Sequence, residues 1–400
     1  MATTTTAEAR RTYAGPALFG FGFRPFFLLA AIWAVVSMIL WIGMLSGHLA
    51  PPSHLSMIDW HVHSLLFGFV PSVIAGFLMT AIPNWTGRMP VYGWPLALLA
   101  GLWLAGRAAL LVSAAIGPVP AIVIDLSFLA ALAAVAGREI AAGRNWRNLK
   151  VLVPVLVLLI ANGIFHVEAL GGAAASGLGM RLGLSAALFL IMLVGGRIIP
   201  SFTRNWLAQH NPGRLPVPFG RFDAAALATA LVALSLWVAV PASLVTALAC
   251  AAAGILHTYR LVRWAGHRTA REPLLLVLHI AYAFVPAGFL LTGLAGLAPA
   301  SIGASTALHA WTAGAVGLMT LSVMIRATRG HSGRALTAPP GTVLILGAVL
   351  GGALLRIAAP YLPVDYQTAI AVSGTIWVAG FGGFVLVYWT ALCRRPLPTQ

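Results

Sequence analysis

Charged residues are scarce in this sequence. Asp, Glu, Lys and Arg make up 8% of the 400 residues, whereas a soluble globular protein contains about 25%. Hydrophobic residues reach 60%, and the mean hydropathy is +0.93. These few charges cannot form the polar surface that a soluble fold of this length needs. Lipid must therefore be the solvent for much of the surface. The composition therefore excludes a soluble globular protein.

Cysteine is nearly absent as well. The chain has two cysteines, Cys250 in a predicted helix and Cys393 at a predicted helix end. A disulfide between them is not expected, and the sequence contains no CxxC-type site. Iron–sulfur clusters and thiolate zinc sites are therefore excluded.

Basic charge is present, but it does not form one patch. The net charge of +16 comes almost entirely from arginine, since Lys150 is the only lysine. In a soluble protein this charge would indicate a nucleic-acid partner. Here the arginines recur between apolar runs, which is the pattern that the positive-inside rule produces. We expect the lipid bilayer as a partner and no nucleic acid.

The apolar runs predict an all-α, polytopic protein with about twelve transmembrane helices in a single membrane domain over residues 1–400. Most runs are near the ~20 residues that cross a hydrocarbon core about 30 Å thick. The predicted helices are 25–47, 61–82, 94–116, 119–137, 150–170, 178–200, 222–240, 242–262, 272–296, 305–327, 341–359 and 367–391.

The connecting loops predict the orientation. Every odd-numbered loop lacks Arg and Lys between the runs, whereas the even-numbered loops and the C-terminal end carry arginines. This alternation predicts that both termini lie in the cytoplasm and that the odd loops lie on the outer, periplasmic side. A missed or additional helix would break the alternation.

Two segments of the chain resemble each other. Residues 63–88 and 309–334 align without a gap and share a histidine at the outer end and Gly-Arg at the inner end. An internal repeat that relates helices 2 and 10 is one interpretation, and a chance similarity due to the biased composition is the other. The longest predicted loop, 201–221, divides the chain into six plus six helices.

Histidines gather at the predicted outer face. Six of the eleven share this position: His48, His54, His61, His63, His166 and His309. His279 lies deeper, in the ninth helix. Ionisable residues inside a membrane are costly and usually functional, and histidines without cysteines favour ligation of haem, copper or iron. An interfacial polar role is the alternative, and we favour it for His48 and His54.

His61 and His63 cannot both face one metal from a regular helix. They are two residues apart, which is about 200° around the helix. A centre that uses one of them needs ligands from other helices, and His166 and His309 are the obvious suppliers. His279 is a further candidate metal ligand.

Other residues suit a flat cofactor. Gly68 and Gly314 each follow a histidine by five residues and would let a porphyrin approach the backbone, although ordinary helix packing explains them equally well. Arg107 could hold a haem propionate or form a buried ion pair with Asp125 in the neighbouring helix. Glu168 is a candidate proton donor, or a solvated helix end.

Several stretches together resemble the NnrS family. They are Arg24 to Phe27, Asp59 to Ser64 with Phe67 to Arg88, Asn162 to Glu168, Gly196 to Trp206, and His309 to Arg334. The resemblance spans nearly the whole chain and implies a twelve-helix protein of the bacterial inner membrane that contains haem and copper and is linked to nitric oxide. A b-type haem is the expected form. Where the family usually has glutamate, this chain has Ser64, which puts copper binding or proton-coupled turnover in question.

The resemblance favours a haem-bearing, or haem and copper, protein that acts on nitric oxide near the periplasmic face. His63 and His309 are then the expected iron ligands, and His61 and His166 would hold a second metal or support it. Reduction of nitric oxide would make the protein an oxidoreductase with an unknown electron donor. A twelve-helix secondary transporter and a non-catalytic haem or copper carrier are the alternatives.

Overall fold

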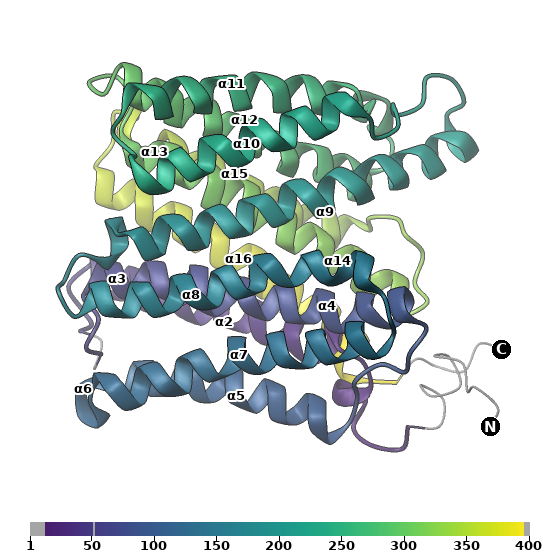
Figure 1. Cartoon of the computed structure of the whole chain (residues 1–400), viewed down its shortest axis with the longest axis horizontal. Coiled ribbons are helices and arrows are strands. Elements are labelled where there is room, and N and C mark those ends of the chain that lie inside the picture. The colour runs from purple at the N-terminus through teal and green to yellow at the C-terminus, as the bar shows by residue number, and fades with distance from the viewer. Residues whose placement is uncertain (1–12, 51–52, 396–400) are drawn as a thin grey trace. The chain divides into compact units, whose positions relative to one another are not determined.

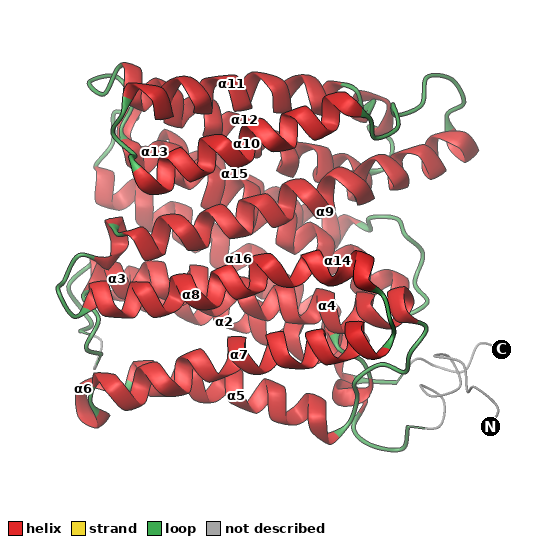
Figure 2. Cartoon of the chain, in the orientation of Figure 1, coloured by secondary structure: helices red, strands yellow, loops and turns green. Residues whose placement is uncertain are grey.

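The computed structural model describes residues 13–50 and 53–395. These residues form helices and loops, and no strand occurs among them (Figure 2). Within the described residues, twelve helical segments are long and apolar enough to cross a membrane. The predicted all-α class and the predicted number of spans are confirmed.

The long helices follow the predicted order (Figure 1). They are α2 (Phe23–Leu45), α4 (Val70–Thr86), α5 (Trp94–Leu111), α7 (Pro118–Ala142), α8 (Leu152–Ala169), α9 (Leu178–His210), α10 (Arg221–Ala239), α11 (Leu244–Val262), α12 (Pro273–Leu297), α14 (Met319–His331), α15 (Pro340–Ala358) and α16 (Tyr366–Cys393). The shorter helical pieces are η1 (Ala17–Gly20), α3 (Met57–His63), η2 (Ser64–Phe69), α6 (Ser113–Ile116), η3 (Trp146–Val151), η4 (Ala174–Ser176), η5 (Gly266–Thr269), α13 (Ala304–His309), η6 (Ala310–Leu318) and η7 (Ala359–Tyr361).

The sixth span is longer than predicted. The expected helix 178–200 continues to His210, so the predicted loop 201–221 is wrong over its first half. Thr203 and Leu207 lie one turn apart and are buried, whereas Arg204 is exposed. This amphipathic turn carries the helix past Pro200, and the helix ends before Asn211-Pro212-Gly213, which is a strong stop signal.

The second span begins earlier than predicted, at Met57. Ser56 caps it, because its hydroxyl accepts the backbone N–H of Asp59 and donates to the Asp59 carboxylate at 2.7 Å. Such a cap satisfies backbone donors that the first helical turn leaves free. The added turn places His63 inside the span rather than at its end.

The chain divides into two compact units. Unit 1 comprises residues 1–183, 327–335 and 384–400, and unit 2 comprises residues 184–326 and 336–383. The division falls within α9 and not in the predicted loop 201–221. The single membrane domain over residues 1–400 stays a prediction.

In unit 1, the odd-numbered loops meet at one end, where α3 and α6 are labelled in Figure 1. Hydrogen bonds tie these loops together: the Ser113 hydroxyl accepts the backbone N–H of His54 at 2.9 Å, and Asp59 accepts that of Ala175 at 2.6 Å. At the other end, Arg88 pairs with Glu139 at 2.9 Å. In unit 1, the loops without basic residues therefore lie at one end of the helices, as the alternation predicts. Which end faces the cytoplasm stays a prediction.

The second and tenth spans share an unusual local structure. Each begins with a short α-helix that ends in a histidine, His63 or His309, and continues directly into a π-helical segment, η2 or η6. They are also the most enclosed spans, with 83% and 72% of their most apolar windows buried. π-helical turns are rare and frequent at functional sites. The equivalence of helices 2 and 10 stays a prediction, and this shared feature is in line with it.

Candidate metal centre

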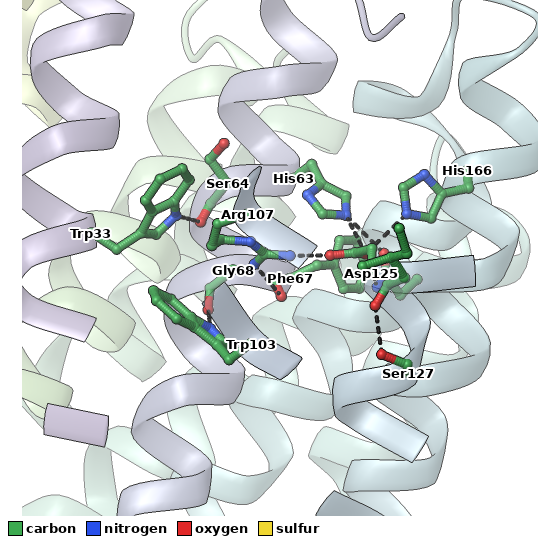
Figure 3. A network of polar contacts seen from close by, with 12 residues as sticks. Trp33, His63, Ser64, Phe67, Gly68, Trp103, Arg107, Asp125, Ser127 and His166 are labelled. Atoms are coloured by element: carbon green, nitrogen blue, oxygen red, sulfur yellow. Dashed lines mark hydrogen bonds and ion pairs between the residues drawn. The ribbon is translucent and has the colours of Figure 1, made fainter. Parts of the chain in front are cut away.

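A buried cluster of His63, Asp125 and His166 lies in unit 1 (Figure 3). His63 Nε2 lies 3.1 Å and His166 Nε2 lies 3.0 Å from Asp125 Oδ2, and the two imidazole centroids are 4.8 Å apart. The three side chains come from the second, fourth and fifth spans. We call them the His63–Asp125–His166 cluster.

Arg107 balances the charge of the cluster. Its guanidinium donates to Asp125 Oδ1 and, at 3.1 Å, to the carbonyl oxygen of Phe67. Both Arg107 and Asp125 are almost fully buried. Gly106 lets α5 and α7 approach here, because a Cβ at Gly106 would lie 3.2 Å from the Asp125 Cα. The predicted Arg107–Asp125 ion pair is therefore present.

Asn162 completes the polar contacts of the carboxylate. Its amide nitrogen donates to Asp125 Oδ2 at 2.8 Å, and its Oδ1 lies 3.0 Å from His63 Nε2. Asn162 and His166 are four residues apart on α8, so they share one face of the helix. Both are fully buried.

The π-helical segment η2 is held by side chains from two neighbouring helices. Trp33 donates to the carbonyl of Ser64 at 2.8 Å, and Trp103 donates to that of Gly68 at 2.9 Å. With Arg107 on Phe67, three carbonyls of this segment accept side-chain donors (Figure 3). Because buried backbone carbonyls need partners, these donors stabilise the wide π-helical turn that follows His63.

The donor set suits a metal ion. One ligand atom from each residue of the cluster can be chosen so that all lie within 4.8 Å of one another. Two imidazoles and a carboxylate match iron, copper or zinc. The Nδ1 atoms of His63 and His166 are buried and have no hydrogen-bond partner among the described residues. In Figure 3 these nitrogens point away from Asp125.

His54 lies beside the cluster, in the loop before α3. Its ring centroid is 6.2 Å from that of His166, and both of its ring nitrogens are buried without a hydrogen-bond partner in the described chain. Burial, together with the positive charge that His166 can carry, lowers the pKa of His54 below its ordinary value. The lower pKa favours the neutral imidazole, which is the form that binds metals.

Two predicted residues of unit 1 lie elsewhere. His61 stacks on Trp41 with centroids 4.1 Å apart, away from the face that carries His63, as their spacing requires. Glu168 accepts the backbone N–H groups of Leu178 and Gly179 at 2.7 and 3.0 Å and caps α9. Glu168 therefore has a capping role that the sequence did not indicate, and its role as a proton donor stays a prediction.

Gly68 makes room for side chains of this chain. A Cβ at this position would lie 2.5 Å from Arg107 and 2.8 Å from Trp33. The space beside the glycine is therefore filled, which favours helix packing over a porphyrin at this position. Arg107 is likewise occupied by Asp125 and Phe67 rather than facing a free propionate site.

Three predicted residues belong to unit 2. His309 donates from Nδ1 to the carbonyl of Ser305 at 2.7 Å, which leaves Nε2 as the free ring position. His279 Nε2 lies 2.8 Å from the Thr203 hydroxyl. Gly314 faces the ring of Phe284, which a Cβ would approach to 2.4 Å. The convergence of His309 with His63 and His166 stays a prediction.

Sequence reasoning missed part of the site. It treated Asp125 only as the partner of Arg107, it assigned no role to Asn162, and it favoured an interfacial role for His54. The spacing of Asn162 and His166 was a usable signal, because residues four apart share a helix face. The meeting of Asp125 with the two histidines depends on which faces of three helices pack together, and no local pattern encodes that.

A comparison with known protein families gives a match. The family described as NnrS protein matches residues 17–395, which is nearly the whole chain and includes both units. No individual curated protein matches the chain.

Proposed function

Because this chain belongs to the NnrS family, we propose that it is a metal-containing membrane protein that acts on nitric oxide at the His63–Asp125–His166 cluster. The observation that carries the proposal is the convergence of two imidazoles and one carboxylate in a buried position. Burial of three such groups within a membrane protein is costly and indicates a use.

Copper is the metal we propose for this cluster. Neutral imidazole suits copper, and the donor set contains no thiolate that would favour zinc or an iron–sulfur cluster. The resemblance raised a doubt because Ser64 replaces a family glutamate. Asp125, from a different helix, supplies a carboxylate to the same histidines. Iron in a site with two histidines and one carboxylate is the second choice.

Haem is the second cofactor we propose, and His309 is the residue that fits it. Its Nδ1 donates to a backbone carbonyl, an arrangement that commonly orients a metal-ligating histidine. Arg356 lies next to it: Nη2 donates to the Ser305 hydroxyl at 3.1 Å, and the buried Nη1 has no hydrogen-bond partner within the described residues. A guanidinium suits a propionate. Side chains fill the spaces beside both Gly68 and Gly314, so neither glycine supports the haem, and the proposal rests on His309 and Arg356.

Reduction is the reaction we propose for nitric oxide. Two molecules of nitric oxide, two electrons and two protons give nitrous oxide and water, so the reaction needs an electron donor that remains to be identified. A bound metal would supply the site where nitric oxide binds and accepts electrons. Nitric oxide is small and neutral and can enter from the bilayer. The bacterial inner membrane is the proposed location.

Two other functions remain as alternatives. A non-catalytic carrier would hold haem or copper at the same residues without consuming nitric oxide. A secondary transporter would use buried charges such as Arg107, Asp125 and His279 as substrate or proton sites. Metal content and nitric oxide consumption distinguish the three.

The test uses the full chain purified in detergent and supplied with copper and haem. We expect the wild type to retain bound copper, to consume nitric oxide in the presence of a reductant and to release nitrous oxide in a ratio of one to two. His166→Ala should lose copper and consumption, whereas His48→Ala should keep both, because His48 is exposed and its Nδ1 lies 2.8 Å from the Ser46 hydroxyl, outside the cluster.

Each other outcome decides against the proposal in a definite way. Bound metal without consumption of nitric oxide would favour the carrier. A protein that binds neither copper nor haem would contradict the proposal and favour the transporter. If His166→Ala still consumed nitric oxide, the reaction would take place at a site other than the cluster.

The haem assignment gives a separate prediction. His309→Ala should remove the visible absorption band of bound haem and leave copper at the His63–Asp125–His166 cluster unchanged, because the two sites use different residues. His279→Ala, a buried histidine of the same unit, serves as the matched control and should keep the band. A haem band that persists in His309→Ala would contradict the assignment.

A further inference from the structure

The Asp125 carboxylate lies between the two histidines and a permanent positive charge (Figure 3). Its Oδ2 atom is 3.1 Å from Nε2 of His63 and 3.0 Å from Nε2 of His166, and its Oδ1 atom accepts a hydrogen bond from Arg107. Donor atoms bound to one tetrahedral metal at about 2.0–2.1 Å lie roughly 3.3 Å apart. Both nitrogen–oxygen distances therefore fit a metal position that Oδ2 shares with the histidines, while Oδ1 is bonded to the arginine.

The Arg107 guanidinium is fixed in its position. It donates to the carbonyl of Phe67 at 3.1 Å, and its central carbon lies 5.9 Å from the ring centroid of Trp33 and 5.7 Å from that of Trp103. Aromatic faces stabilise a cation that has lost its water. Gly68 leaves room for the group, because a Cβ there would lie 2.5 Å from Nη1. The positive charge is therefore held beside the carboxylate.

This charge is buried and has a single acidic partner. Arg107 is 5% exposed, and within the described residues it pairs with no carboxylate other than Asp125. A guanidinium stays protonated, and histidines bind metals as neutral imidazoles. The carboxylate and the guanidinium cancel, so the cluster has no net charge before a metal binds. Salt in the solvent screens a buried charge only weakly.

The oxidation state of bound copper changes the charge that the site must bury. With Arg107 in place, Cu(I) gives the site a net charge of +1 and Cu(II) gives +2. Without the guanidinium, the same ions would give 0 and +1. The cost of burying a charge rises with its size. Arg107 therefore disfavours Cu(II) more strongly than it disfavours Cu(I).

We propose that Arg107 is a positioning residue that acts through Asp125, and that its guanidinium raises the reduction potential of copper bound at the His63–Asp125–His166 cluster. The change is the uptake of one electron by Cu(II) to give Cu(I), and no bond of the chain forms or breaks in it. A weaker one-electron donor can then reduce the site. This inference rests on the proposed function, since it concerns the same centre.

A purely structural role for Arg107 makes a different prediction. An ion pair that only allows Asp125 to be buried would, when it is broken, weaken the binding of Cu(I) and Cu(II) together. Partners of a ligating carboxylate also affect metal affinity by holding the ligand in place. The ratio of the two affinities separates the roles, because only an electrostatic effect on the oxidation state changes it.

The test measures Cu(I) and Cu(II) binding separately on the full chain purified in detergent, with a chromophoric chelator specific for each ion as the competitor. Ascorbate supplies the electron that keeps copper as Cu(I). Arg107→Gln and Arg107→Met both remove the charge. We expect each to lower the ratio of Cu(I) to Cu(II) affinity by about 10–100-fold, the effect of one unit charge at an effective permittivity near 20.

Two further variants serve as controls. Arg107→Lys keeps the charge and should stay within about threefold of the wild-type ratio. Arg138→Gln removes an arginine that is two-thirds exposed in the same unit and should leave the ratio unchanged.

The outcomes separate the inference from the proposed function. An unchanged ratio in the neutral variants, or a ratio that rises, would overturn the inference and leave the proposed function intact. An equal fall in Arg107→Lys and Arg107→Gln would also overturn it, because the effect would then not depend on charge. A wild type that binds neither copper ion, or binding that His166→Ala does not weaken, would contradict the proposed function itself.

Discussion

Asp125→Ala is expected to lower the thermal unfolding midpoint of the detergent-solubilised protein by roughly 6–20 °C. The substitution leaves Arg107 as a buried charge without its counter-ion, which costs about 3–5 kcal/mol, and each kcal/mol corresponds to about 2–4 °C in a unit of this size. His63, His166 and Asn162 also lose their shared acceptor. Circular dichroism at 222 nm on heating measures the change.

A double substitution separates the charge from the packing. Arg107→Met with Asp125→Asn removes both charges and keeps one acceptor for the histidines, so it should recover more than half of the lost midpoint. Arg138→Ala is the control, because this guanidinium is two-thirds exposed and pairs with Glu139 at 2.7 Å. Exposed pairs contribute little. A midpoint for Asp125→Ala equal to that of Arg138→Ala would contradict the role of the buried pair.

The spans were predictable because lipid imposes a length. An apolar run near twenty residues has few alternatives to a membrane helix, and arginines in alternate loops fixed the number of crossings. The rule gives the wrong helix end where a polar segment continues the helix. Residues 201–210 are too polar for an apolar run, yet they continue α9 because Thr203 and Leu207 bury one face.

The π-helical segments were not predictable from local sequence. In η2, the carbonyls of Ser64, Gly68 and Phe67 accept hydrogen bonds from Trp33, Trp103 and Arg107, which lie on other helices. Such a turn is stable only when these donors arrive from tertiary packing. The histidine and glycine that residues 63–88 and 309–334 share indicated that the two spans are related. They did not indicate that each span contains a π-helical segment.

The sequence predicted two parts of the centre separately: the histidines, and the Arg107–Asp125 ion pair. The cost of ionisable groups in a membrane singled out His63, His166, Arg107 and Asp125, and the hairpin of the third and fourth spans predicted the ion pair. The two parts form one site because Asp125 directs one carboxylate oxygen to Arg107 and the other to both histidines. That is a property of how four helices face one another, which the spacing along the chain does not contain.

Unit 2 contains a second buried charge whose loss should have a comparable effect. Arg260 is 1% exposed and donates to Asp223 Oδ1 at 3.1 Å, to the Tyr282 hydroxyl at 2.8 Å and to the carbonyl of Met192 at 3.2 Å. Within the described residues, Asp223 is the carboxylate that pairs with Arg260. Asp223 also accepts the backbone N–H of Gly220 at the start of α10.

Asp223→Ala is therefore expected to lower the unfolding midpoint reported by unit 2 by roughly 6–20 °C, since it leaves Arg260 unpaired. Cys250 is a local probe, because it is fully buried in α11 and a Cys393→Ser background leaves it as the single thiol. The temperature at which a maleimide fluorophore labels Cys250 measures the change. Arg263→Ala is the matched control: this residue lies 3.5 Å from the same carboxylate and is partly exposed, so its loss should shift labelling by only about 1–3 °C. Equal shifts in the two variants would mean that Asp223 does not stabilise unit 2 through Arg260.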